Sequence, residues 1–187
     1  MIKNKNLYKI IIINVILMFG FLNISKANYD KIFYDHSIKS IDGLEINLSE
    51  FKGKAFLLVN VASYCGFTKQ YADLQKVWDK YKEKGLVVLG IPSRSFNQEK
   101  DTEGEVKDFC EVNFSITFPM SAIFDVKGSK AHEIYKWAEK NYGKKSVPKW
   151  NFHKILINRN GKIEDTFASF TNPNSNKIIN AIEKVLN

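Results

Sequence analysis

The sequence predicts an α/β protein in which a mixed central β-sheet lies between two layers of helices. Two observations carry this prediction. Strand and helix patterns alternate along the chain from residue 55 to residue 186, which is typical of a three-layer sandwich. Ala55–Val61 and Leu86–Ile91 are almost wholly apolar, as expected for neighbouring strands that are covered on both faces.

A helix separates these two strands. Hydrophobic side chains recur at helical spacing from Tyr71 to Tyr81, and Gly85 ends the segment. Because a strand, a helix and a strand of this length form a βαβ unit, we expect the two strands to pair in parallel.

The other elements are predicted from the same kinds of pattern. Residues 37–41 and 44–48 alternate around Asp42-Gly43, which indicates an N-terminal hairpin extension. The second half is predicted to hold helices over about 102–113, 131–141 and 176–186, and a hairpin of strands 155–157 and 163–167.

The first 27 residues have the order of a secretory signal peptide. Three lysines precede the apolar run Ile10–Ile24, and Ser25-Lys26-Ala27 ends in a small residue. As a helix the run spans roughly 22 Å, which is short against a hydrocarbon core of roughly 30 Å. We therefore expect a periplasmic or secreted protein cut after Ala27, with an uncleaved membrane anchor as the alternative.

Composition limits the function classes of the remaining chain. The whole sequence carries a net charge of +8, and removal of segment 1–27 with its four lysines leaves +4 on residues 28–187. No arginine-rich or aromatic-interleaved basic tract remains, so nucleic-acid binding is not predicted. So small a charge favours at most a transient membrane contact. Without repeats or linkers, residues 28–187 are expected to form one domain.

Cys65 is the residue whose position most strongly suggests a catalytic role. It lies where the strand 55–61 ends and the first helix begins. A thiol at a helix N-terminus meets unpaired N–H groups and the positive end of the helix dipole, which favour the reactive thiolate. Position alone is equally compatible with an inert, buried cysteine.

Four sequence blocks follow one another in a distinctive order. They are Asn60-Val61-Ala62-Ser63-Tyr64-Cys65-Gly66-Phe67-Thr68, Gly85-Leu86-Val87-Val88-Leu89-Gly90-Ile91-Pro92-Ser93, Thr117-Phe118-Pro119-Met120 and Lys149-Trp150-Asn151-Phe152. From about Tyr34 to the C-terminus the chain resembles the glutathione peroxidase family, in its cysteine rather than its selenocysteine branch. The resemblance implies a thioredoxin-like fold and reduction of hydrogen peroxide and of organic or lipid hydroperoxides, in response to oxidative stress.

By this resemblance, Gln98, Trp150 and Asn151 complete a catalytic tetrad with Cys65. Amide and indole N–H groups can donate hydrogen bonds to the sulfur and to the leaving oxygen. Taken alone, Trp150 would be interpreted as a core aromatic and Asn151 as a turn residue. The loop around Gln98 departs from the family pattern in length, so Asn97 is the alternative donor.

Cys110 is the second cysteine. The resemblance implies a resolving role, in which Cys110 forms a disulfide with the oxidised Cys65 that thioredoxin-like donors then reduce. From the residues alone, Cys110 shares an apolar helix face with Val106 and Phe109 and is equally well a packing residue. A further cysteine of some relatives is Ser93 here.

Three other functions are compatible with parts of this sequence. Two cysteines of an exported chain can form a permanent structural disulfide. A thiol–disulfide oxidoreductase shares the fold but normally carries Cys-x-x-Cys, where this chain has Cys65-Gly66-Phe67-Thr68. A non-catalytic peroxide sensor uses the same reactive sulfur.

No metal or other cofactor is expected. His36, His132 and His153 are scattered without ligand spacing. The short stretch 142–149 resembles the compact branch of the family, which implies a monomer with a shallow, open site. Without a cationic set specific for glutathione, a thioredoxin-like protein is the preferred reductant and glutathione the alternative.

Overall fold

The computed structural model describes residues 29–187, so the predicted signal peptide lies outside the described residues. The central sheet has four strands in the order β4-β3-β5-β6. Their bounds are Ala55–Val61 for β3, Leu86–Pro92 for β4, Lys154–Ile157 for β5 and Ile163–Phe167 for β6. As predicted, β3 and β4 are parallel, whereas β5 pairs antiparallel with both β3 and β6. The sheet is therefore mixed.

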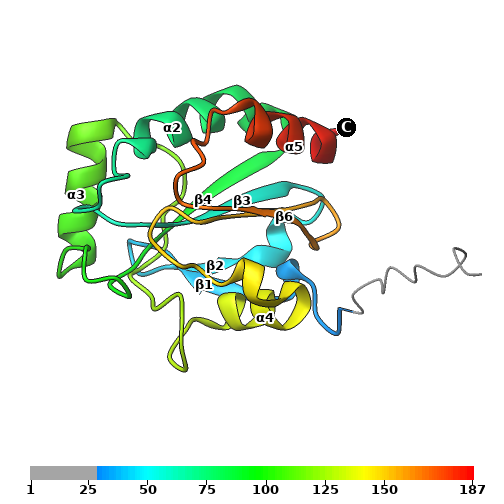
Figure 1. The fold of residues 1–187 in the computed structure, drawn as a ribbon, viewed down its shortest axis with the longest axis horizontal. Helices are drawn as coiled ribbons and strands as arrows, with labels where there is room; N and C mark the ends of the chain where they lie inside the picture. Colours follow the sequence, from blue (N-terminus) through cyan, green and yellow to red (C-terminus); the bar gives the residue numbers. More distant parts are fainter. Residues whose placement is uncertain (1–28) are drawn as a thin grey trace, which may run out of the picture.

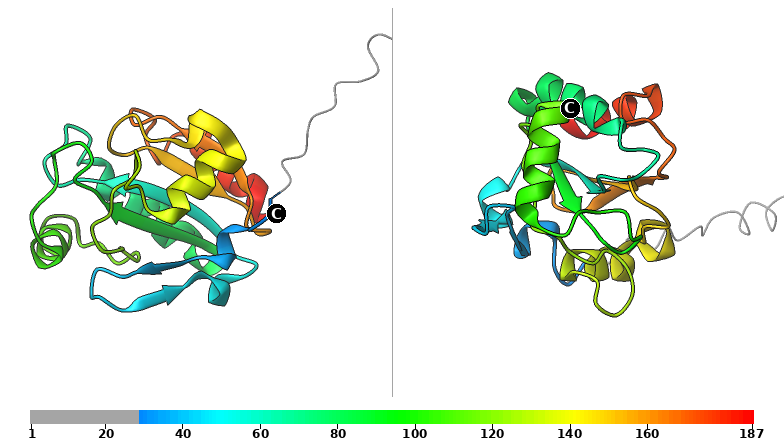
Figure 2. Two further views of the ribbon diagram at one scale, coloured as in Figure 1. Left: turned by 90° about the horizontal axis from the view of Figure 1, so that it is seen from below. Right: turned by 90° about the vertical axis from the view of Figure 1, so that its left-hand side faces the viewer.

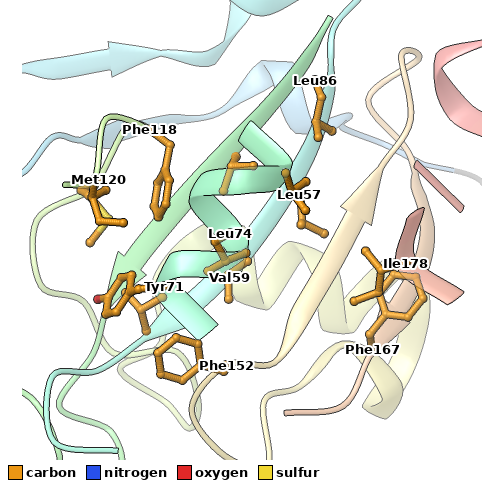
Figure 3. Close-up of a cluster of buried hydrophobic side chains, with 14 of the residues drawn as sticks. Leu57, Val59, Tyr71, Leu74, Leu86, Phe118, Met120, Phe152, Phe167 and Ile178 are labelled. Carbon is orange, nitrogen blue, oxygen red and sulfur yellow. The ribbon is translucent and has the colours of Figure 1, made fainter. Parts of the chain in front are cut away.

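Successive residues of β3 supply two separate cores, because side chains of a strand point alternately to the two faces of a sheet. Leu57 and Val59 belong to one buried cluster, which Figure 3 shows against α2. Phe56 and Leu58 belong to the other. This double burial explains why the strand is apolar along its length.

Helices cover both faces of the sheet (Figure 1). One face carries α2 (Gln70–Tyr81) and α5 (Asn176–Leu186), and the opposite face carries α4 (Glu133–Tyr142). Helix α3 (Glu103–Phe114) stands across the end of the sheet, in front in the right-hand view of Figure 2. Within residues 29–187, no helix combines the length and apolar character that a membrane crossing requires.

The predicted hairpin forms a separate two-stranded sheet of β1 (Ser37–Lys39) and β2 (Glu45–Asn47). Residues 120–122, for which the sequence predicted no pairing, join this hairpin to the main sheet. The Ile41 N–H donates to the Met120 carbonyl at 3.0 Å, while Gly90 of β4 forms a parallel bridge with Met120. Strand β4 is therefore covered at its outer edge.

Two predicted helix boundaries differ from the structure. Helix α4 begins at Glu133 instead of residue 131, because His132 is its N-cap and accepts the Ile134 N–H through Nδ1. Helix α2 ends at Tyr81, and a short 3₁₀ turn leads to Gly85, whose φ of 94° is the left-handed conformation that glycine adopts without strain.

The start of α3 carries a testable stabilising contact. Thr102 Oγ1 accepts the Glu105 N–H at 3.3 Å, and Glu105 Oε2 accepts the Thr102 N–H at 3.0 Å. Substitution Thr102→Ala should lower the free energy of unfolding by about 1 kcal/mol, because an N-cap acceptor is lost. Urea denaturation followed by circular dichroism measures the loss. Thr102→Ser keeps the acceptor and should retain most of the wild-type free energy of unfolding. Equal losses of stability in both variants would contradict the capping role.

Candidate active site

Cys65 lies in a tight turn between β3 and α2. The helix begins only at Gln70, so the prediction that Cys65 itself occupies the helix N-terminus is wrong by five residues. The turn supplies a donor of another kind, since the Phe67 N–H points at Cys65 Sγ with an N···S distance of 3.4 Å. The thiol is 7% exposed. Its local hydrogen-bond donor is therefore a turn amide.

Thr68 fixes this turn. Its hydroxyl accepts the Cys65 N–H at 3.1 Å and lies 2.9 Å from the carbonyl oxygen of Ala62, to which it can donate. Side chains that bond to backbone groups within a few residues commonly hold turns in this way. The residue three positions after Cys65, where a redox Cys-x-x-Cys motif has its second cysteine, thus has a structural role here.

The loop that follows β4 brings Gln98 to the site. Gln98 Oε1 accepts a hydrogen bond from Asn151 Nδ2 at 3.0 Å, and the Gln98 carbonyl accepts the Tyr64 N–H at 2.9 Å. Asn97 is exposed and has a φ of 55°. Of the two donors that the sequence left open, Gln98 is the one in contact with Asn151, and Asn97 is exposed to solvent.

Trp150 and Asn151 occupy a turn that leads into β5. The next residue, Phe152, has a φ of 62°, an uncommon conformation for a bulky residue, which costs of the order of 1 kcal/mol or more. Asn151 is fully buried, whereas Trp150 is 42% exposed and packs its ring 5.3 Å from that of Phe96. Trp150 is therefore at the surface and not in the core, and Asn151 lies beneath it.

Asn60, which the sequence analysis did not single out, holds this turn. Its Nδ2 donates to the Trp150 carbonyl at 3.2 Å, and its Oδ1 accepts the His153 N–H at 3.1 Å. Its own carbonyl accepts the Phe152 N–H at 2.6 Å. The sequence did contain a signal for this role. Asn60 is a polar residue inside an otherwise apolar strand, and a buried amide must have hydrogen-bond partners.

Glu99 is a second functional candidate that sequence reasoning missed. Its carboxyl group is 8% exposed, and Oε1 accepts the backbone N–H groups of Ser63 at 3.0 Å and Lys100 at 2.9 Å. Ser63 stands two residues before Cys65. The carboxylate therefore joins the cysteine turn to the Gln98 loop, and burial raises its pKa above the ordinary value of a glutamate.

Cys110 lies in α3 and is 2% exposed. Burial raises the pKa of its thiol to about 11, although the nearby Tyr71 hydroxyl acts in the opposite direction. Both cysteines are free thiols and belong to the same buried cluster. The structure thus contains no permanent disulfide between them.

A groove of about 640 Å³ is lined by Trp150, one of the four predicted site residues. Its apolar lining includes the side chains of Phe67, Val147, Trp150 and Phe170. Its basic lining consists of three lysines, Lys144, Lys145 and Lys149. Phe67, which belongs to the Cys65 turn, places the groove next to that turn. The groove therefore combines an apolar lining with positive charge.

The histidines take structural positions. His132 caps α4, His36 Nδ1 lies 3.3 Å from Glu133 Oε1, and His153 is buried. Burial lowers the pKa of His153 to about 4. Among residues 29–187, no three or more His, Cys, Asp or Glu side chains are grouped so that they could bind a metal ion.

A cysteine at the end of the central β3 strand, with amide and indole groups from two neighbouring loops, defines a thiol-based oxidoreductase of thioredoxin-like fold. The family model for glutathione peroxidase matches residues 33–139. The chain therefore belongs to the glutathione peroxidase family, and it is a peroxiredoxin-like hydroperoxide reductase of that family.

Individual relatives agree with this assignment. The chain is 40% identical over 148 residues to glutathione peroxidase-like peroxiredoxin 2 of Saccharomyces cerevisiae, covering 76% of this chain and 91% of the relative. It is 36% identical over 169 residues to hydroperoxy fatty acid reductase gpx1 of Synechocystis sp., covering 86% and 99%. The crystal structure of GPX1 of T. cruzi superposes with a TM-score of 0.65 at 31% identity, covering 83% and 97%.

The buried Glu99 carboxyl predicts a pH dependence of stability. Because its pKa is raised in the folded protein, the folded state retains a proton that the unfolded state releases above pH of about 4.5. The free energy of unfolding of the wild type, relative to Glu99→Gln, should therefore fall as pH rises through the raised folded value. Urea unfolding of both proteins at pH values from about 4.5 to about 8 measures this difference.

Glu105 provides the control of opposite sign. The hydrogen bond from Thr102 lowers the pKa of Glu105 from its ordinary value of 4.5. The wild type should therefore gain stability relative to Glu105→Gln as pH rises from the lowered folded value to the ordinary one, so this pair is measured below the pH range used for Glu99. Parallel curves for wild type and Glu99→Gln would show that the Glu99 carboxyl titrates as it does in the unfolded chain.

Proposed function

We propose that Cys65 is the peroxidatic cysteine of this hydroperoxide reductase, and that Gln98, Trp150 and Asn151 stabilise its charge and that of the leaving oxygen. The observation that carries the proposal is the contact between Asn151 and Gln98 at 3.0 Å, together with the bond from Tyr64, beside Cys65, to the Gln98 carbonyl. Three loops that are distant in the sequence thus meet around the turn of one cysteine.

The first half-reaction follows from these groups. The Cys65 thiolate attacks one peroxide oxygen, the O–O bond breaks, and the sulfur becomes a sulfenic acid. The leaving alkoxide or hydroxide takes up a proton and departs as alcohol or water. Because Gln98 Oε1 is bound to Asn151, the Nε2 end of the Gln98 amide is oriented as the donor. Preorganised donors of this kind are worth about 2.7–4 kcal/mol each at the charge that develops.

Cys110 is proposed as the resolving cysteine. Its thiol attacks the Cys65 sulfenic acid, forming the Cys65–Cys110 disulfide and releasing water. Because Cys110 is buried in α3, we propose that this part of the helix opens locally, so that the two Cα atoms come within the roughly 7 Å that a disulfide requires. A pKa of about 11 keeps the buried Cys110 protonated in the resting enzyme, which limits premature reaction of this thiol.

The substrate class is proposed from the groove. An acyl chain fits its apolar side chains, and a carboxylate complements Lys144, Lys145 and Lys149. The Synechocystis relative, a hydroperoxy fatty acid reductase, supports this assignment. We therefore assign long-chain hydroperoxides, beside hydrogen peroxide, to this site. We propose that a chain bound in the groove carries its peroxide group near Phe67, which belongs to the Cys65 turn.

The cellular setting is proposed on the sequence evidence. The signal-peptide pattern of residues 1–27 supports export to the periplasm or the medium, where the monomeric enzyme is reduced by a thioredoxin-like protein, with glutathione as the alternative. A sensor of peroxide would share the first oxidation but would pass the disulfide to a partner protein.

The decisive experiment is the intact mass of the reduced protein, residues 28–187, before and after one equivalent of hydrogen peroxide. We expect a loss of about 2 mass units, mapped to a Cys65–Cys110 disulfide. Cys110→Ser should instead gain about 16 mass units as the sulfenic acid on Cys65. Cys65→Ser should show no fast change.

Other outcomes identify which part of the proposal is wrong. A gain of about 16 mass units in the wild type would make Cys110 structural. Fast oxidation of Cys65→Ser would remove Cys65 from the mechanism. Disulfide formation without sustained turnover by thioredoxin or glutathione would favour the sensor.

A further inference from the structure

Lys154 is a buried cation that the peroxidase chemistry does not use. It is fully buried at the start of β5, and its Nζ donates to Gln70 Oε1, to the Ser169 carbonyl at 3.2 Å and to the Thr171 carbonyl at 2.7 Å. All three acceptors are neutral oxygens. A buried ammonium group normally requires a paired carboxylate, so this arrangement has a cost that three charge-assisted hydrogen bonds offset.

Gln70 connects this hydrogen-bonded group to the segment that follows Cys65. It stands in the first turn of α2, shortly after Cys65, and its Nε2 donates to the Ser169 carbonyl at 2.8 Å. Ser169 is therefore held by both Lys154 and Gln70. Together these residues connect β5 and the loop after β6 to the N-terminus of α2, which is distant from both in the sequence.

The Ser169–Thr171 loop, which Lys154 and Gln70 bind, contributes to the wall of the groove. The two carbonyls that Lys154 binds belong to Ser169 and Thr171, the residues on either side of Phe170. Phe170 lines the groove and is 77% exposed, so little packing of its own side chain holds it in place. Phe67, which also lines the groove, lies three residues before Gln70, at the start of α2.

We propose that Lys154, acting with Gln70, is a specificity-determining positioning residue that holds the Ser169–Thr171 loop, and with it Phe170, in the conformation that receives the chain of a long-chain hydroperoxide. The inference rests on the proposed use of the groove. Lys154 does not touch the reacting atoms, and hydrogen peroxide does not need the wall that Lys154 positions. The contribution of Lys154 should therefore appear in substrate selectivity.

The electrostatics support a positioning role. Burial lowers the pKa of Lys154 to about 7, because desolvation disfavours the charged form. A lysine needed only for packing is replaceable by methionine, which is of similar length and uncharged. Retention of the ammonium group is explained by the two loop carbonyls, which a methionine cannot bind.

The test compares two substrates in the same enzyme, linoleic acid hydroperoxide and hydrogen peroxide. For Lys154→Met, the ratio of kcat/KM for the lipid to that for hydrogen peroxide should fall about tenfold, mainly through a higher KM for the lipid, because a displaced apolar wall is worth about one or two methylene groups. Gln70→Ala removes the same loop contact from α2 and should shift the ratio in the same direction. If Lys154→Met fails to fold, the Gln70→Ala variant provides the test in its place.

Two control variants distinguish a failure of the positioning role of Lys154 from a failure of the proposed substrate site. Lys184→Met removes a surface lysine that pairs with Glu164 at 2.8 Å and should leave the ratio unchanged. Phe170→Ser alters the wall directly. If Phe170→Ser leaves the lipid KM unaffected, the groove does not bind the chain and the proposed substrate site is wrong. If Phe170→Ser raises the lipid KM while Lys154→Met and Gln70→Ala do not, the positioning role of Lys154 is overturned.

Discussion

The site depends on the carboxamide of Asn60, which is fully buried in β3 and hydrogen-bonded at both ends. It holds the Trp150–His153 turn against the strand that leads to Cys65. The turn includes Phe152 in a left-handed conformation, which persists only where the surroundings impose it. Asn60 supplies that constraint, because its bonds to Trp150 and His153 fix the turn on both sides of the strained residue.

Two ionisable groups near the site are buried without a partner of opposite charge. Glu99 binds the backbone N–H groups of Ser63 and Lys100, and Lys154 binds carbonyl oxygens. Each connects loops instead of forming an ion pair. Because an unpaired buried charge is costly, such a group is bound firmly to whatever backbone donors or acceptors it reaches. The loops that carry the tetrad and the groove are thereby held together without regular secondary structure.

The two cysteines have different surroundings. Cys65 stands in a turn with a backbone N–H directed at its sulfur, and amide and indole donors lie on the adjoining loops. Cys110 is enclosed in α3, and burial raises its pKa. A protonated, enclosed thiol is a poor nucleophile. The proposed second step is therefore coupled to local opening of the helix, so the order of the two half-reactions follows from their environments.

Apolar periodicity and turn residues are local properties, so the strands, the helices and the position of Cys65 after β3 could be predicted from the sequence. Gln98 was predicted as the donor by resemblance, but the sequence left Asn97 open as its substitute. That choice depends on Asn151, 53 residues from Gln98. The roles of Asn60, Glu99 and Lys154 were likewise decided only by the tertiary structure. Their hydrogen bonds span 93, 36 and 84 residues, and a buried polar residue shows its function only when folding brings its partner within reach.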